Sequence, residues 1–216
     1  PIRACSSMAE QAAHNRLVEG SNPSGPILYL TGTESLFSTA CKLTVMRIIT
    51  DRLILRRFSE KDLMDLFEYL SDSEVVKFEP YLPMTLEEVG AELNRRIQSD
   101  EMVAVELKSS SKLIGNIYLG KRENNALELG FVFNKDYWKQ GFAKESCTDL
   151  IHKAFSDGTD RIFAECDPEN RNSCQLLENL GFSCIAHLEK NVFFWRDANG
   201  EPIWKDTYVY SLENPG

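Results

Sequence analysis

Residues 126–143 read ALELGFVFNKDYWKQGFA, which predicts a strand, a short loop and the start of a helix. Large apolar residues alternate along the first part with the period of two of a β-strand; they are Leu127, Leu129, Phe131 and Phe133. Residues 134–136 are turn formers. Farther on, apolar residues recur at helical spacing; they are Ala143, Cys147, Leu150, Ile151, Ala154 and Phe155. We therefore expect a strand–loop–helix unit here.

A loop that leads from a strand into a helix is suited to binding phosphate. The first amides of a helix have no partner within it, and the helix dipole is positive at that end. Gly141 allows a ligand to come close to the backbone. Lys135, Lys139 and Lys144 crowd the same turn, although the net charge of the chain is −9. The alternative is a loop that only connects two elements and whose lysines are solvated.

The sequence WKQGFA at 138–143 resembles the pyrophosphate loop of the GCN5-related N-acetyltransferases, the GNAT family. That loop is written roughly Gln/Arg-x-x-Gly-x-Gly/Ala. Trp138 stands at its first position, and Gly141 and Ala143 stand at the glycine and small-residue positions. The branch of ribosomal-protein-alanine N-acetyltransferases, which this chain resembles, commonly has Tyr-Trp-Gly-x-Gly here. Lys139 replaces the first of these glycines, which leaves a backbone N–H in place.

A second motif of the same family is matched by DPENRNSCQLLENLGF at 167–182. Asn170 and Ser173 are both suited to capping a helix. The resemblance implies that Asn170 also contacts the pantetheine arm of the cofactor. The stretches TDRLILR at 50–56 and DTYVYSL at 206–212 resemble the opening and the ending of the branch. The resemblance covers essentially all of residues 46–216, and its two central motifs are specific only in combination.

Length and composition indicate one globular domain, or one domain with a tail. The chain has 216 residues, of which 43% are hydrophobic and 26% charged, as in core-forming proteins. The acidic balance argues against a general nucleic-acid-binding surface. No apolar run approaches the roughly 20 residues that span a bilayer. We expect neither a nucleic acid nor a membrane as partner. The acidity weakly favours a cationic acceptor, and simple solubility is the alternative explanation.

The cysteines and histidines do not predict a metal site. The six cysteines form no Cys-x-x-Cys pair and have no zinc-type spacing to a histidine. Without a secretion signal we expect them to remain thiols in the cytoplasm. Cys147 lies on the apolar helical stripe and is expected in the core.

Residues 1–45 are expected to lie outside the domain. They show no sustained period of 2 or 3.6, and their charges cancel, so the net charge of −9 belongs to residues 46–216. Residues 6–11 back-translate as AGC TCA ATG GCA GAG CA, which resembles the D arm of a transfer-RNA gene. Residues 19–23 back-translate as GAG GGT TCG AAT CCC, which resembles the T arm. We expect that the start codon was placed too early and that Met46 begins the natural protein. A disordered extension is the alternative.

The remaining patterns predict further strands and helices on both sides of residues 126–143. Expected strands cover 47–58, 102–107, 112–119, 161–166, 182–190, 191–195 and 203–212. Helices are expected from Ser59 to Leu70 and, after a capping box at Thr85–Glu88, to about Gln98. With the family resemblance, this order predicts an α/β (α+β) fold, a mixed and mostly antiparallel sheet flanked by helices on both faces.

In a GNAT domain, the segment 71–83 and the helix after it would form one wall of the acceptor cleft. Glu79, Glu87 and Glu88 could face a cationic acceptor there. For Glu87 and Glu88, a solvated helix N-terminus is the alternative.

The resemblance implies how acetyl-coenzyme A (acetyl-CoA) is held. The strand before the loop splays from the next strand, and backbone groups of Phe131, Val132 and Phe133 bind the pantetheine arm. Amides of the loop bind the pyrophosphate; the loop residues are Trp138, Lys139, Gln140, Gly141, Phe142 and Ala143. No metal is required.

Acetyl transfer to an amine needs a neutral amine, a donor for the oxyanion and, for the leaving thiolate, a proton. Glu128 is the candidate base. A free glutamate has a pKa of about 4.3, so water or burial would have to help, and a residue that only binds the ammonium is the alternative. Leu177 stands where many members have a proton-donating tyrosine. Ser173 is a substitute donor, with helix capping as the alternative.

These observations predict an N-acetyltransferase that moves the acetyl group from acetyl-CoA to a protein N-terminus or a small amine by direct attack in a ternary complex. The missing tyrosine and the altered loop leave open a non-catalytic acyl-CoA-binding sensor of the same fold. A monomer and a homodimer both fit the sequence.

Overall fold

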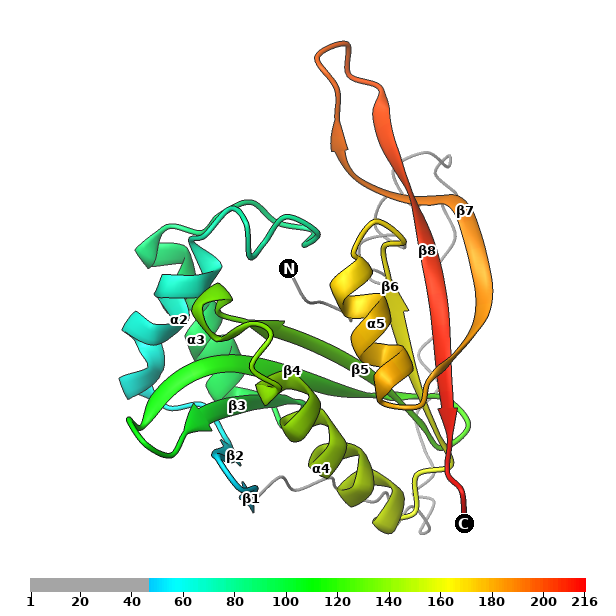
Figure 1. Cartoon of the computed structure of the whole chain (residues 1–216). Helices are drawn as coiled ribbons and strands as arrows, with labels where there is room; N and C mark the ends of the chain where they lie inside the picture. Colours follow the sequence, from blue (N-terminus) through cyan, green and yellow to red (C-terminus); the bar gives the residue numbers. More distant parts are fainter. Residues whose placement is uncertain (1–46) are drawn as a thin grey trace, which may run out of the picture.

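The computed structural model describes residues 47–216 (Figure 1). The predictions for residues 1–45 and for Met46 as the natural start lie outside the described residues. In chain order the elements are β1 (Ile48–Ile49), β2 (Leu53–Arg56), η1 (Glu60–Asp62), α2 (Leu63–Leu70), α3 (Leu86–Gln98), β3 (Met102–Leu107), β4 (Lys112–Arg122), β5 (Ala126–Phe133), η2 (Lys135–Tyr137), α4 (Phe142–Ser156), β6 (Arg161–Cys166), α5 (Arg171–Asn179), β7 (Ser183–Arg196) and β8 (Pro202–Glu213).

The strands form one eight-stranded sheet in the order β1-β2-β3-β4-β5-β6-β8-β7. Neighbouring strands pair antiparallel except β5 and β6, which are parallel. A parallel pair needs a crossover connection, and α4 supplies it between these two strands. The predicted mixed, mostly antiparallel sheet is confirmed.

Helices cover both faces of the sheet, so the central strand is buried on both sides. All eight residues of β5 are buried. Its alternating residues Leu127 to Phe133 share a core cluster with α4 and α5. Val132 points the other way, into a second cluster with α2 and α3. The period of two therefore distributes one strand between two helical layers.

The segment 47–58 differs from the prediction of one strand. It forms two short antiparallel strands, β1 and β2, which are joined by a turn at Thr50–Arg52. Thr50 fixes this turn: its N–H donates to the Leu53 carbonyl at 3.1 Å, and its hydroxyl accepts from the Leu53 N–H at 3.0 Å. Side-chain bonds of threonine to nearby backbone compete with a continuous strand.

Two further predictions needed small corrections. The helix expected from Ser59 begins with the 3-10 turn η1, where the Ser59 N–H donates to Asp62 Oδ2 at 2.8 Å. The two strands expected at 182–190 and 191–195 are one strand, β7, with register shifts against β8. The shifts bend the strand without ending it, as bulges do.

The caps predicted at Thr85 and Asn170 are present, whereas the one predicted at Ser173 is not. Thr85 and Glu88 form the capping box of α3. The Asn170 side chain caps α5 by accepting from the Ser173 N–H. Ser173 itself lies inside the helix, so the capping role falls to Asn170 alone.

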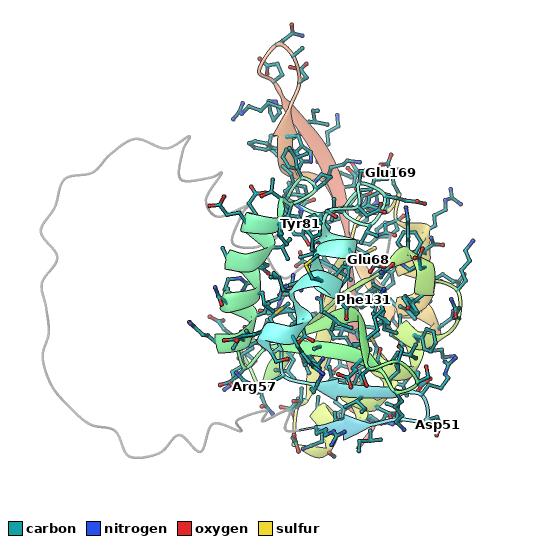
Figure 2. All side chains as sticks on the ribbon, turned by 90° about the vertical axis from the view of Figure 1, so that its left-hand side faces the viewer. Asp51, Arg57, Glu68, Tyr81, Phe131 and Glu169 are labelled. Atoms are coloured by element: carbon teal, nitrogen blue, oxygen red, sulfur yellow. The ribbon has the colours of Figure 1, made fainter. Side chains whose placement is uncertain are left out.

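The two ends of the molecule differ in shape. The β7–β8 hairpin extends well beyond the body of the domain (Figure 1). Phe131 lies near the middle of the molecule, with Tyr81 and Glu169 on the side of this hairpin and Asp51 at the opposite end (Figure 2). Within residues 47–216, no helix is both long enough and apolar enough to traverse a bilayer.

Candidate active site

Strands β5 and β6 pair only where they begin. The register runs through three pairs, the last of which joins Glu128 to Phe163. Strand β5 continues for five more residues to Phe133. Over that length its edge no longer pairs with β6, so the two strands open like a V. Phe131, Val132 and Phe133, the residues predicted to hold the pantetheine arm, lie in this open part.

The loop after β5 is held by its own polar groups. Asn134 Oδ1 accepts from the Asp136 N–H at 3.0 Å and so caps the turn η2. The Trp138 indole donates to the Phe133 carbonyl at 2.8 Å, and the Gln140 amide donates to the Asp136 carbonyl at 2.8 Å. Trp138 therefore closes the loop onto the end of β5.

Two residues of the loop have left-handed backbone. Gly141 is the N-cap of α4 with φ of 82°, and Lys139 has φ of 59°. Lys139 stands where the branch has glycine, and it adopts the conformation that glycine favours. For a residue with a Cβ this costs roughly 1–2 kcal/mol. The sequence departs from the motif here, but Lys139 has a left-handed backbone that a glycine would adopt without strain.

Arg52 and Glu145 support this loop, and neither was among the predicted site residues. An Arg52 guanidinium N–H donates to the Gln140 carbonyl at 3.0 Å, and Arg52 Nε lies 2.7 Å from Glu145 Oε2. The guanidinium also lies 4.3 Å from the centre of the Phe142 ring. Arg52 belongs to the TDRLILR stretch, which resembles the opening of the branch. The sequence did not indicate, however, that the Arg52 side chain contacts Gln140 and Glu145.

Glu145 is held as an anion. Burial works to raise its pKa, but hydrogen bonds from the Thr50 hydroxyl and from Arg52 outweigh burial and lower the pKa below its usual value. The carboxylate can therefore fix the β1–β2 turn against the start of α4.

A pocket of about 290 Å³ lies between this loop, the start of α4 and α5. The predicted cofactor residues that line it are Phe133, Trp138, Lys139, Gly141, Phe142 and Ala143. Across from them are residues of α5 that were not predicted, namely Asn172, Gln175, Leu176 and Asn179. Phe131, Val132, Gln140 and Asn170 are not among the lining residues. Phe131 and Val132 are core side chains, so any contact they make with a ligand in the V would come from their backbone.

Asn170 provides the most direct indication of a ligand. The residue is 1% exposed, and its Oδ1 accepts from the Ser173 N–H at 3.3 Å. Its Nδ2 is buried without an acceptor among the described residues. Leaving a buried donor without an acceptor costs about 1–3 kcal/mol, and a ligand carbonyl would remove that cost. Together with the open strands and the loop amides, this donor fits the pantetheine and pyrophosphate of coenzyme A.

Ser173, the predicted proton donor, and Leu177 lie on the inner side of α5. Ser173 and Leu177 are both fully buried. The hydrogen bond with Cys174 and burial raise the pKa of the Cys166 thiol, and a hydrogen bond with the Ser173 hydroxyl opposes this rise. Leu177 packs into the core cluster with α4. The helix thus presents an aliphatic side chain at the position where the resemblance predicts the proton-donating tyrosine of many members.

Glu128 lies at the closed end of the V. It is 6% exposed, and its Oε2 is 2.9 Å from Arg122 Nε. Arg122 also contacts Glu165 at 2.8 Å. Burial works to lower the pKa of Arg122, but its hydrogen bonds with Glu165 and Glu128 keep the pKa above its usual value. The structure thus places the candidate base in a three-membered charge cluster.

On the opposite face of the sheet, a buried polar network connects α2, β4 and α3. Asn116 Oδ1 accepts from the Tyr69 hydroxyl at 2.9 Å and from Arg96 at 2.8 Å. Arg96 also pairs with Glu92 at 2.7 Å. Asn116 is opposite Val132 in register, so this network lies directly behind the open part of β5.

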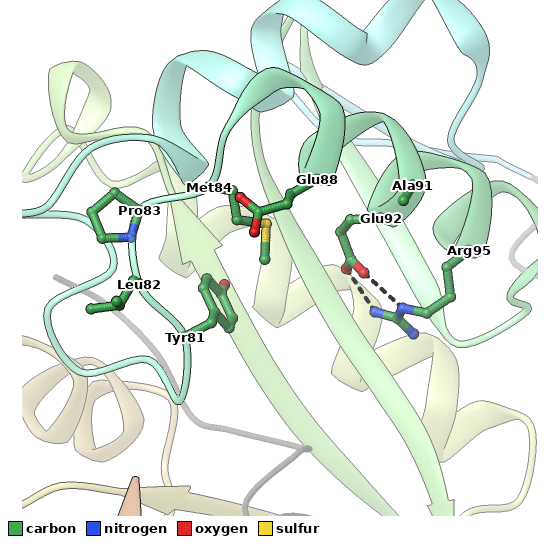
Figure 3. A pocket seen from close by; sticks show the side chains of 8 residues that line it. All are labelled: Tyr81, Leu82, Pro83, Met84, Glu88, Ala91, Glu92 and Arg95. Carbon is green, nitrogen blue, oxygen red and sulfur yellow. Dashed lines mark hydrogen bonds and ion pairs between the residues drawn. The ribbon is translucent and has the colours of Figure 1, made fainter. Parts of the chain in front are cut away.

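The segment before α3 forms a second, shallower pocket of about 430 Å³ (Figure 3). Tyr81, Met84, Glu88, Glu92 and Arg95 are among its lining residues. Glu88 is engaged in the capping box with Thr85. Glu79 is buried, whereas Glu87 is exposed on the first turn of α3. Of the three glutamates named from the sequence, only Glu88 lines this pocket.

Comparisons with known proteins agree with this geometry. A family model described as an acetyltransferase (GNAT) domain matches residues 52–183. The chain belongs to the GNAT family. It is 32% identical over 173 residues to the uncharacterised N-acetyltransferase YnaD of Bacillus subtilis, a match that covers 77% of this chain and 96% of the relative. This GNAT domain is therefore an acetyl-CoA-dependent acyltransferase of the N-acetyltransferase type.

Solved structures share the fold. An acetyltransferase of the GNAT family from Bacillus anthracis has a TM-score of 0.71 at 29% identity, covering 79% of this chain and all 100% of that one. A spermidine N-acetyltransferase from Vibrio cholerae, in complex with CoA and spermine, has a TM-score of 0.62 at 20% identity, covering 76% of this chain and 96% of that one. At that identity the second likeness concerns the fold alone.

Proposed function

We propose that this GNAT domain transfers the acetyl group of acetyl-CoA directly to a primary amine, either a protein N-terminus or a small amine, in a ternary complex. The observation that carries the proposal is the buried Asn170 amide, four residues after the end of β6. A chain that only needed a stable core would have little reason to bury a donor there without an acceptor.

Each step of binding has residues suited to it. Amides of Lys139 to Ala143 at the start of α4 would hold the pyrophosphate, helped by the helix dipole. The backbone of Phe131 to Phe133 and the Asn170 amide would align the pantetheine arm. Acetyl-CoA supplies an activated thioester, and the protein supplies the position of the amine against its carbonyl. A backbone N–H of the open strand would stabilise the oxyanion.

Proton transfer is assigned to two residues. Glu128 would accept the amine proton through water, or bind the ammonium, because its carboxylate is buried at the base of the V. Ser173 would supply the thiolate proton in place of the tyrosine that Leu177 replaces.

A binding protein without catalysis is the second candidate. It is favoured by one observation, the fully buried Leu177 at the position of the usual acid. Direct attack does not require that acid if water can protonate the thiolate, so we prefer the enzyme.

The test is release of free thiol from acetyl-CoA with a panel of acceptors. Peptides with free N-termini and polyamines form the panel, and the same peptides with acetylated N-termini are the controls. Thiol release that depends on a free amine supports the proposal. Tight binding of coenzyme A in calorimetry, without turnover on any amine, would favour the sensor.

A further inference from the structure

Two thiols lie against each other where β6 meets α5. Cys166 is the last residue of β6, and Cys174 lies in the first half of α5. Their Sγ atoms are 3.6 Å apart. An S–S bond measures about 2.05 Å, so the two atoms need to approach by only about 1.5 Å to be joined. Both are free thiols in the structure, as are Cys147 and Cys184.

We propose that Cys166 and Cys174 are a redox modification site: a peroxide oxidises them to a reversible disulfide, and this bond weakens the binding of coenzyme A. The first part rests on the two thiols alone. The second part rests on the proposed contact between Asn170 and the cofactor.

The exposure of the two thiols sets the order of the chemistry. Cys174 is partly exposed, whereas Cys166 is buried. The hydrogen bond with Cys166 lowers the pKa of Cys174 to about 7. The Cys174 thiolate attacks one peroxide oxygen, which forms a sulfenic acid and releases water after proton uptake. Cys166 then attacks that sulfur and displaces a second water. In total, two thiols and one hydrogen peroxide give one disulfide and two waters.

The bond would be felt at the cofactor site because the segment between the two cysteines carries Asn170. The Cys166 sulfur lies 3.4 Å from the Asp167 carbonyl and 3.8 Å from the carbonyl of Asn170 itself. Oxidation removes the thiol hydrogens from these contacts and pulls the sulfur toward α5. We expect the Asn170 backbone, and with it the buried amide, to shift.

Peptide mapping tests the first part in the unmodified sequence. The reduced protein is treated with hydrogen peroxide, remaining thiols are blocked with N-ethylmaleimide, and the digest is analysed by mass spectrometry. Trypsin separates Cys166 from Cys174 by cleavage after Arg171, and cleavage after Glu178 separates Cys174 from Cys184. We expect a peptide pair joined through Cys166 and Cys174 that disappears on treatment with dithiothreitol. Absence of this pair, or a pair joined through Cys184 in its place, would overturn the proposal.

Calorimetry with coenzyme A tests the second part. We expect severalfold weaker binding by the oxidised protein, with recovery after dithiothreitol. The variant Cys174→Ser should show no change of affinity on oxidation, while the matched variant Cys184→Ser should respond like the original protein. A disulfide that leaves the affinity unchanged would overturn the coupling. If the reduced protein did not bind coenzyme A at all, the proposed function would fail, whereas the mapped disulfide would stand or fall by itself.

Discussion

Arg52 Nε lies 2.7 Å from Glu145 Oε2, and this pair joins the turn between β1 and β2 to the first turns of α4. The Arg52 backbone N–H also donates to Glu145 at 2.8 Å, across 93 positions of the sequence. Since the same guanidinium reaches the Gln140 carbonyl, one arginine fixes both the helix N-terminus and the loop that precedes it. The shape of the proposed pyrophosphate site thus depends on a residue outside the loop.

We expect Arg52→Gln to weaken binding of coenzyme A while the domain stays folded. The side chain is 46% exposed, so the pair is partly screened by solvent. The expected loss is about fivefold in affinity, which corresponds to roughly 1 kcal/mol. Calorimetry with coenzyme A at low salt measures it.

Arg57→Gln is the matched control for Arg52→Gln. Arg57 is similarly exposed and pairs with Asp100 near the end of α3, away from the loop. The Arg57→Gln variant should leave the affinity for coenzyme A unchanged. Equal losses in both variants would show that total charge, and not the position of Arg52, sets the affinity.

Gly141→Ala should reduce both stability and cofactor affinity. The residue has φ of 82°, and an added Cβ would lie 3.4 Å from an Arg52 nitrogen. The strained backbone costs about 1 kcal/mol, and its relaxation would displace the amides that the phosphate needs. Urea unfolding and calorimetry with coenzyme A give the two effects separately.

Gly158→Ala separates strain from function. Gly158 has φ of 94° just after the other end of α4, with open space around its Cα. The Gly158→Ala variant should lose about as much stability as Gly141→Ala and keep its affinity for coenzyme A. Were Gly141→Ala to bind coenzyme A as tightly as Gly158→Ala does, the loop would not be the phosphate site.

The pieces of the site that are local in sequence were predictable. The spacing of apolar residues and the turn formers at 134–136 predicted the strand, loop and helix of residues 126–143, and Asn170 was recognised as a helix cap. Local spacing sets backbone shape, and the residues that take part lie within a few positions of one another.

Contacts between distant segments were not predictable in this way. Arg52 pairs with Glu145, and Glu128 pairs with Arg122, only because the fold brings these segments together. Neither Glu145 nor Arg122 belongs to a sequence motif that would have identified it. The break between β1 and β2 was missed because the alternation of residues 53–58 was extended back to Arg47. Three polar residues at 50–52 interrupt the apolar pattern there, and the Thr50 hydroxyl stabilises the turn between the two strands. The opening of β5 from β6 was predicted only through the family resemblance. The types of side chain in a strand do not reveal where its backbone groups are left unpaired.

Acid should destabilise the domain partly through Glu106. This buried carboxylate pairs with Arg56 at 2.7 Å and with Lys61 at 2.9 Å. Burial works to raise its pKa, but the two cations outweigh burial and lower the pKa in the folded state. A lowered folded pKa contributes stability above the unfolded value of about 4.3, and the contribution is lost as the pH falls through the folded pKa.

Urea unfolding at pH 7 and at pH values below about 4.3 checks this contribution. Glu106→Gln should lower the stability at pH 7 and make its decline with acid shallower than in the original protein. Glu87→Gln, which changes an exposed glutamate on α3, is the control and should change neither. An equally steep decline in Glu106→Gln would place the acid sensitivity in other carboxylates.

Glu128→Gln tests the proposed base against a structural role. The carboxylates of Glu128 and Glu165 both contact Arg122. Replacing either one removes one carboxylate from the same arginine, so we expect similar losses of stability in Glu128→Gln and Glu165→Gln. Only Glu128 lies on β5, the strand proposed to align the thioester. A general base typically contributes a factor of about 10²–10⁴ to the rate, so Glu128→Gln should lower kcat by about that much, while Glu165→Gln should retain most of it.

Separate measurements of kcat and of the KM for the amine distinguish a base from a residue that binds the ammonium. Loss of a base lowers kcat at saturating amine, whereas loss of a binding carboxylate raises the KM for the amine and leaves kcat near its original value. Measurements of both constants between pH 6 and pH 9 with a single amine, on both variants, give this comparison. If both kcat and the KM for the amine of Glu128→Gln match those of Glu165→Gln at every pH, Glu128 serves only to hold Arg122 in place, and the proton must leave the amine by way of water alone.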